Sequence, residues 1–130
     1  MATFEVSPHM TVRPGQLEGF KKQAAELIRI TKEKDTHTLR YDWFLSNDGT
    51  ECEVREAYTG PEGLIEHNAH IIDARTKLFK DYADNHFMTV YGEPSQKLLD
   101  LLKEGRCHAR SLRPPDGATG TAGGLQKAGG

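Results

Sequence analysis

The chain of 130 residues is poor in the features that mark membrane, secreted and nucleic-acid-binding proteins. No apolar run approaches the roughly 18 to 20 residues that span a bilayer, and the N-terminus lacks the basic and then apolar pattern of a signal peptide. Its 17 basic residues are scattered along the sequence and are balanced by 19 acidic ones, which argues against a nucleic-acid footprint. We therefore expect a cytoplasmic protein that binds neither a membrane nor a nucleic acid.

Cysteines and cofactor motifs are also sparse. The two cysteines, Cys52 and Cys107, form no C-x-x-C pair, and a reducing compartment argues against a disulfide between them. The sequence contains no Walker loop, no GxGxxG motif and no GxSxG nucleophile elbow. A nucleotide cofactor therefore has no visible site.

The apolar residues that are present form a definite order of elements. Alternation predicts strands at residues 3–12, 36–46, 50–59 and 87–91. Helical spacing predicts helices that begin at Pro14 and at a capping box over residues 59–62, then a helix at 95–104 and a short edge strand at 107–112. This β-α-β-β-α-β order, with an added C-terminal helix and strand, predicts an α+β ferredoxin-like sandwich.

The length suits one such domain, which we place at residues 1–112. Residues 113–130 are rich in glycine and almost free of apolar side chains, which predicts a flexible tail. Helices of this sandwich cover one face of the sheet, and the other face, with Arg40, Phe44, Arg55 and Ala57, could pack on a second copy. We therefore expect a homodimer, unless the C-terminal segment covers that face itself.

Two alternating runs joined by a turn at residues 47–49 predict an antiparallel hairpin. The inner face of the hairpin carries Leu39, Tyr41, Trp43 and Leu45 from the first run and Cys52, Val54, Glu56 and Tyr58 from the second. In the first strand of the chain, Pro8 indicates an edge position or a bulge.

Glu56 is the only formal charge on either apolar face of this hairpin. A buried carboxylate must be hydrogen-bonded, paired or protonated, because an isolated buried charge costs several kcal/mol. The inner stripe of the second predicted helix offers a partner, since it includes His67 or Asn68. Glu56 therefore needs a neighbour, and His67 is the candidate.

These inner faces bring together six residues that could line a pocket: Tyr41, Trp43, Glu56, Tyr58, His67 and Asn68. A carboxylate that holds one ring nitrogen of a histidine fixes its tautomer and raises its basicity, so Glu56 and His67 form a candidate acid–base couple. The alternative is a buried structural hydrogen bond between them, with Tyr58 in the core. Tyr41 and Trp43 are candidates to contact a flat ligand.

A metal site is a weaker hypothesis. His67 and His70 lie three residues apart beside Glu66, a spacing that can place two imidazoles on one metal. The set lacks the HExxH order and a third ligand at a fixed spacing, so we expect no metal. The other histidines are expected at the surface or at a sheet edge: His9, His37, His86 and His108.

The sequence resembles the antibiotic biosynthesis monooxygenase superfamily, and within it the small quinol monooxygenases. The resemblance is carried by residues 12–15, 40–46 and 48–51, by the Glu56-Ala57-Tyr58 run and by Glu66-His67, and it covers residues 3 to about 94. It implies a dimeric α+β barrel that oxygenates a phenolic or quinol-type aromatic with O₂, without flavin, haem or metal.

The resemblance also implies roles for the candidate residues. His67 would remove a phenolic proton and Glu56 would orient it, while Tyr58, Trp43 and Asn68 would position the ring and the oxygenated intermediate. The antibiotic-tailoring members use a differently arranged set of asparagine, tryptophan and arginine, so the substrate does not transfer.

Three hypotheses of function remain. The leading one is a cofactor-independent monooxygenase acting on a small aromatic compound, which predicts O₂ uptake that depends on His67. The second is a dimeric module that only binds a small molecule, for which ligands would shift the melting temperature without turnover. The third is haem binding or degradation through His67, which a Soret band after haem titration would reveal.

Overall fold

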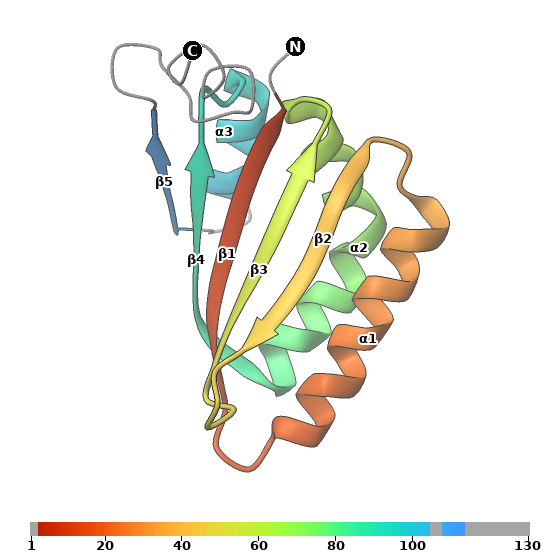
Figure 1. Ribbon diagram of the computed structural model, residues 1–130, viewed down its shortest axis with the longest axis vertical. Helices are drawn as coiled ribbons and strands as arrows, with labels where there is room; N and C mark the ends of the chain where they lie inside the picture. The colour runs from red at the N-terminus through yellow and green to blue at the C-terminus, as the bar shows by residue number, and fades with distance from the viewer. Residues whose placement is uncertain (1–2, 105–107, 114–130) are drawn as a thin grey trace, which may run out of the picture.

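A computed structural model describes residues 3–104 and 108–113 of the chain. Its elements follow one another as in Figure 1: β1 (Phe4–Val12), α1 (Leu17–Lys34), β2 (Thr38–Leu45), β3 (Glu51–Tyr58), α2 (Pro61–Asp81), β4 (Ala83–Tyr91), α3 (Gln96–Glu104) and β5 (His108–Leu112). The predicted ferredoxin-like α+β order is confirmed, including the added C-terminal helix and strand. The predicted tail, apart from Arg113, lies outside the described residues, as does Cys107.

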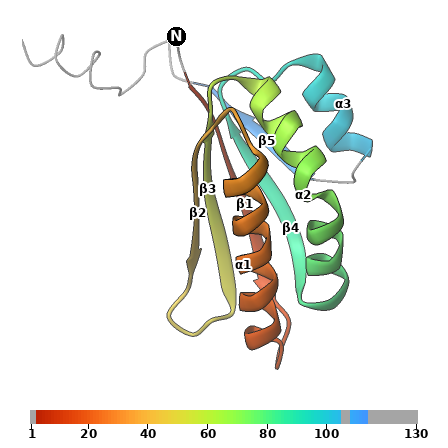
Figure 2. The ribbon, with the colours of Figure 1, turned by 90° about the vertical axis from the view of Figure 1, so that its right-hand side faces the viewer.

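The strands form one sheet in the order β2-β3-β1-β4-β5. Neighbouring strands are antiparallel except β4 and β5, which run parallel. Figure 2 shows the three helices on the same side of the sheet, so no described helix covers the other face. Within the described part of the chain, no helix is both long and apolar enough to cross a membrane.

The edge position considered for Pro8 is wrong, because β1 is the central strand of the sheet. The register between β1 and β3 is the same before and after the proline, although the ladder skips Ser7 and Pro8. A proline has no backbone N–H to donate, so a short interruption is all that it requires. The alternative, a bulge, is found just beyond it, where the register with β4 shifts between His9 and Thr11.

Leu39 does not lie on the inner face of the hairpin, as the alternation predicted. A bulge between Thr38 and Arg40 shifts the register of β2 with β3, and Leu39 is 58% exposed. A bulge adds one residue to a strand, so alternation counted across it assigns residues to the wrong face. Thr38 is placed opposite Tyr58 instead, and its hydroxyl donates a hydrogen bond of 2.6 Å to Asp35.

Two element boundaries also differ from the prediction. Gly60 is the residue before α2, and no side chain caps that helix, so the predicted capping box at Thr59 is absent. β4 begins at Ala83 rather than at Phe87. The polar residues at 84–86 break the alternation on which the prediction depends, so this part of the strand was not predicted.

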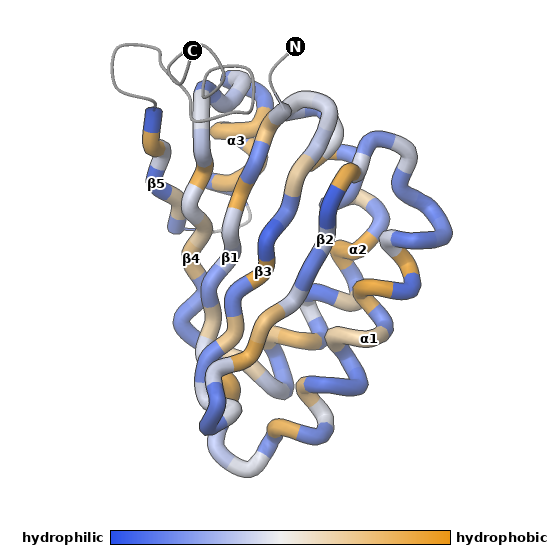
Figure 3. The backbone as a smooth tube through the Cα atoms, in the orientation of Figure 1, coloured by the Kyte–Doolittle hydropathy of each residue, from blue (hydrophilic) through white to orange (hydrophobic). Residues whose placement is uncertain are grey.

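Two apolar clusters make up the core on the helical side of the sheet. One joins Val6 and Tyr58 to Leu98 and Leu102 of α3. The other includes Phe20, Met10, Leu78 and Cys52, and apolar stretches recur along all three helices in Figure 3. Cys52 is inward-facing as predicted, and burial raises the pKa of its thiol to about 12. The C-terminal helix is thus part of the core and not an appendage.

Candidate active site

An apolar cavity of about 230 Å³ lies between the sheet and helices α2 and α3. Its apolar wall includes side chains from β1, α2, β4 and α3, such as Met10, Ile71, Met88 and Leu98. Its polar lining consists of Tyr41, Trp43, Glu56, Asn68, Arg75, His86 and Glu104. Four of the six residues predicted for the site therefore line one cavity: Tyr41, Trp43, Glu56 and Asn68. The lining does not include Tyr58 or His67.

Glu56 is the buried carboxyl group of this cavity. It faces inward from β3, opposite Val6 of β1, and is 5% exposed. The Tyr58 hydroxyl donates a short hydrogen bond to its Oε1. Burial raises the pKa of Glu56, and the charge of His67, the Tyr58 hydrogen bond and the charge of Arg75 only partly oppose this. The carboxyl group is therefore disposed to hold a proton at a higher pH than an exposed glutamate.

The two tyrosines near Glu56 remain protonated. Burial raises the pKa of Tyr58 well above its ordinary value, and the charge of Glu56 and the hydrogen bond to it add to the shift. The pKa of Tyr41 is raised well above its ordinary value, first by burial and then by the charge of Glu56. Both side chains can therefore donate hydrogen bonds but do not act as bases.

The predicted hydrogen bond between Glu56 and His67 is absent. His67 Nδ1 instead lies 2.7 Å from Oδ2 of Asp35, and both side chains are almost fully buried. Asp35 is the residue that follows α1. The C-terminal end of a helix disfavours a carboxylate, but an acidic residue there does not by itself indicate a buried partner.

Asp35 holds three side chains at once. Its Oδ1 lies 2.6 Å from Nδ1 of His70, while Oδ2 receives the Thr38 hydroxyl and faces His67. Burial alone would raise the pKa of Asp35, but the hydrogen bonds from His67, His70 and Thr38 outweigh it and bring the pKa to about 2. Asp35 is therefore ionised at neutral pH.

The His67 ring lies between two tyrosines. Its centroid is 4.6 Å from that of Tyr41 in an edge-on arrangement and 5.7 Å from that of Tyr58. Its Nε2 is buried and has no hydrogen-bond partner among the residues that the structure describes. His67 is thus fixed by Asp35 beside the cavity wall, and it influences Glu56 through its charge.

Two further polar residues of the cavity were not predicted as site residues. Arg75 was one of two candidates for the inner stripe of α2, and it does face the cavity. His86 was expected at the surface or at a sheet edge; it is half-buried and lines the cavity, with its ring centroid 4.5 Å from that of Phe79. Burial, followed by the charge of Arg75, lowers the pKa of His86 to about 4, so its imidazole is neutral at pH 7. Because the first half of β4 was missed, the place of His86 in the cavity was not predicted.

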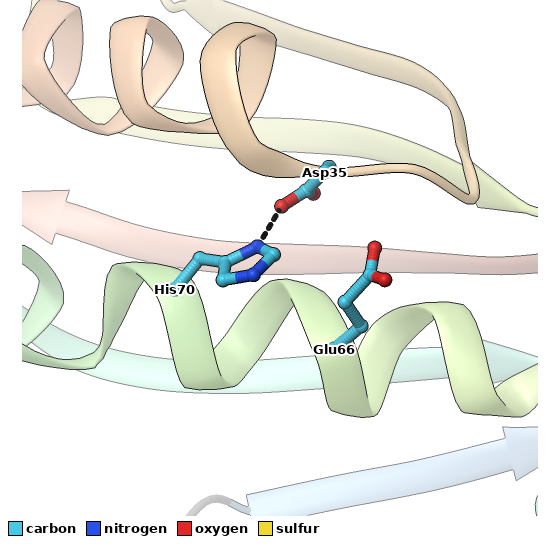
Figure 4. Close-up of side chains that lie close together, drawn as sticks. All are labelled: Asp35, Glu66 and His70. Atoms are coloured by element: carbon cyan, nitrogen blue, oxygen red, sulfur yellow. Dashed lines mark hydrogen bonds and ion pairs between the residues drawn. The ribbon is translucent and has the colours of Figure 1, made fainter.

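The structure also changes the candidate metal set. The described residues with ligand atoms within 4.8 Å of one another are Asp35, Glu66 and His70, and this set does not include His67 (Figure 4). Glu66 already accepts hydrogen bonds from the backbone N–H and the hydroxyl of Thr36, at 2.8 and 2.7 Å. Asp35 is engaged with both histidines, so hydrogen bonds within the chain account for this cluster.

Comparisons of sequence found no match, either to a family model or to a curated protein. Comparisons of structure found many. MupZ from Pseudomonas fluorescens superposes with a TM-score of 0.72 at 22% identity, covering 95% of this chain and 98% of its own. A protein named "putative antibiotic biosynthesis monooxygenase" from Nitrosomonas europaea has a TM-score of 0.62 at 20% identity, covering 70% and 89%.

A protein of the same name from Caulobacter crescentus also has a TM-score of 0.62, at 19% identity, and covers 68% of this chain and 86% of its own. The fold is that of the antibiotic biosynthesis monooxygenases. The resemblance seen in the sequence is thereby confirmed at the level of the fold. The match to MupZ spans so much of the chain that it must extend beyond β4, into the part that includes the α3 wall of the cavity.

Proposed function

We propose that the cavity binds a small phenolic or quinol-type aromatic compound, which the protein oxygenates with O₂ without a bound cofactor. The observation that carries this proposal is Glu56, a buried carboxyl group with a raised pKa in the wall of an apolar cavity. An apolar cavity of roughly 150 Å³ is enough to hold benzene, so one of about 230 Å³ admits a compound of one or two rings. Tyr41 and Trp43 add aromatic faces to its wall.

In this proposal Glu56 takes the phenolic proton. A base is most effective when its pKa is close to the working pH, and burial moves the pKa of Glu56 in that direction. The phenolate gives one electron to O₂, and the two radicals combine at a ring carbon. A molecule of water is then lost. One atom of O₂ stays on the ring, and the other leaves in the water with two hydrogens of the substrate, so a quinol becomes a hydroxyquinone.

The other predicted residues have supporting roles. Tyr58 holds the carboxyl group of Glu56 through its hydroxyl. His67 is a positioning residue and not the base that the resemblance implied, because it is bonded to Asp35 and is not part of the cavity lining. Asn68 lines the cavity, and its amide makes no hydrogen bond within the described residues, so it is available to a developing oxyanion.

Oxygen consumption by the metal-free protein with a panel of quinols and polycyclic phenols tests this proposal. We expect Glu56→Gln to lower the rate by about 10²-fold or more, because general-base catalysis contributes that much. Glu53→Gln is the matched control, since Glu53 lies on the same strand but is exposed. A rate that is unchanged in Glu56→Gln would remove Glu56 as the base, and the absence of uptake with a bound ligand would favour a protein that only binds.

The cavity by itself equally supports that second candidate, a small-molecule-binding protein without turnover. Haem binding through His67 gains no such support. The side chain of His67 is 2% exposed and is not part of the cavity lining, so its ring does not face an iron atom in the cavity.

We also propose that the protein is a homodimer that buries the sheet face without helices (Figure 2). Exposed large apolar side chains occur there on both outer parts of the sheet: Phe44 of β2 and Phe87 of β4 are 52% and 40% exposed. We expect light scattering to give twice the chain mass of 14.5 kDa, and Phe44→Ser to shift the mass toward the monomer. A monomeric wild type would contradict the dimer.

A further inference from the structure

Among the described residues, Arg75 is the one that lines the cavity with a permanent positive charge. It lies on α2 two turns after Asn68, and the spacing of seven residues places both on the same helix face toward the cavity. The guanidinium is half-buried, and within the described residues it makes no salt bridge and no hydrogen bond. Its charge still affects both Glu56 and His86, so it lies within electrostatic range of both.

No described neighbour of Arg75 forms an ion pair with it. The charge of Arg75 lowers the pKa of Glu56, but no salt bridge or hydrogen bond joins the two side chains. His86 is neutral at pH 7. Glu104 lies at the end of α3, is exposed, and forms no ion pair with Arg75. The guanidinium therefore keeps hydrogen-bond donors available to a ligand in the cavity.

We propose that Arg75 binds a carboxylate of the substrate, and that the natural substrate is therefore an aromatic compound with a phenolic hydroxyl near Glu56 and a carboxylate near Arg75. This deepens the proposed function and rests on it. The guanidinium of an arginine can donate two parallel hydrogen bonds to one carboxylate. These two bonds set the orientation of a planar ring and also strengthen its binding. The opposite end of the ring is then directed to the proton acceptor.

Anaerobic calorimetry with para-hydroxybenzoate and para-hydroxybenzamide tests the inference, because the two probes have nearly the same shape and differ in charge. We expect the wild type to bind the carboxylate on the order of tenfold more tightly than the amide, the usual effect of a hydrogen bond to a charged group. Trp43, the single tryptophan of the chain, lines the cavity, so its fluorescence should report binding at this site.

Arg75→Gln should bind both probes equally, while Arg75→Lys should keep part of the preference, because lysine keeps the charge without the fork. Arg29→Gln is the control, since Arg29 is an exposed residue of α1 paired with Glu26 and Glu33. Circular dichroism checks that each variant is folded. Equal binding of the probes by the wild type, no binding of either, or a preference that survives in Arg75→Gln would overturn the inference.

Oxygen consumption separates this inference from the proposed function. If the wild type consumes O₂ with neutral quinols and shows no preference for the carboxylate, the oxygenase stands and the inference is wrong. If the carboxylate binds through Arg75 but no phenol supports O₂ uptake, the inference stands and the oxygenase does not.

Discussion

Glu56 and Asp35 are two buried carboxyl groups that both interact with His67, and their pKa values are shifted in opposite directions. Asp35 accepts hydrogen bonds from His67, His70 and Thr38, and its pKa falls to about 2. Glu56 accepts one from Tyr58, and burial raises its pKa. Burial is the largest single influence on both groups, so the number of donors around the carboxylate decides the outcome.

The difference assigns a different task to each group. A carboxylate that stays ionised is suited to hold histidines in place, because its charge and its hydrogen bonds persist at neutral pH. A carboxyl group whose pKa is raised toward neutrality is suited to exchange a proton with a ligand. Asp35 is accordingly placed between α1 and α2, away from the cavity lining, whereas Glu56 is part of that lining.

Removing the charge of Asp35 should have the largest effect on stability. Asp35→Asn leaves His67 and His70 beside a neutral amide, and breaking a buried pair costs about 3 kcal/mol. We expect a loss of this size in the free energy of unfolding from urea denaturation at pH 7. Asp42→Asn, at an exposed pair with Arg40, should cost less than about 0.5 kcal/mol.

The same variant tests the direction of the pKa shift of Asp35. Its pKa in the folded protein is about 2, below the ordinary value of 3.8, so the folded state binds this proton less tightly than the unfolded chain does. The stabilisation is thus present above pH 3.8 and is lost as the pH falls toward 2. In Asp35→Asn, this part of the decrease in stability at acid pH should be absent. A decrease as large as that of the wild type would contradict the lowered pKa of Asp35.

Glu56→Gln should have a smaller effect on the free energy of unfolding, and the pH dependence of that effect should have the opposite sign. Because burial raises the pKa of Glu56 above 4.5, the folded protein holds this proton more tightly than the unfolded chain. Its contribution to stability therefore falls as the pH rises from 4.5 through the folded-state pKa. Glutamine cannot ionise, so the variant should gain stability relative to the wild type over this range.

Thermal unfolding at a series of pH values measures this difference. Glu53→Gln, on the exposed face of the same strand, should follow the wild-type profile. If the wild-type and Glu56→Gln profiles run parallel from pH 4.5 to neutrality, the raised pKa of Glu56 is wrong, and with it the contrast between the two carboxyl groups.

Sequence patterns predicted most of the fold because the patterns are local. Alternation in β3 correctly placed Cys52, Val54, Glu56 and Tyr58 on the buried face, and helical spacing correctly placed His67 among the buried residues of α2. Alternation failed at Leu39, where a bulge reverses the faces. A bulge depends on how two strands pair, and the sequence of the bulged strand alone does not indicate it.

The sequence predicted which residues line the candidate site better than it predicted the hydrogen bonds between side chains. Tyr41, Trp43, Glu56 and Asn68 were expected to line a pocket, and they line one cavity. Asp35 was missed because it lies between a helix and a strand, where no periodicity indicates the direction of a side chain. Arg75 and His86 reach the cavity only because α2, β4 and α3 pack around it.

The amino-acid sequence by itself determined the order of helices and strands, the buried position of Glu56, and the need of that carboxyl group for a partner, since each follows from periodicity or from the cost of burying a charge. Only the tertiary structure decided which partner each carboxyl group has. Hydrogen bonds such as those of Asp35 to His67 and His70 join residues 32 and 35 positions apart. Their geometry is set by how α1 packs against α2, which no local pattern encodes.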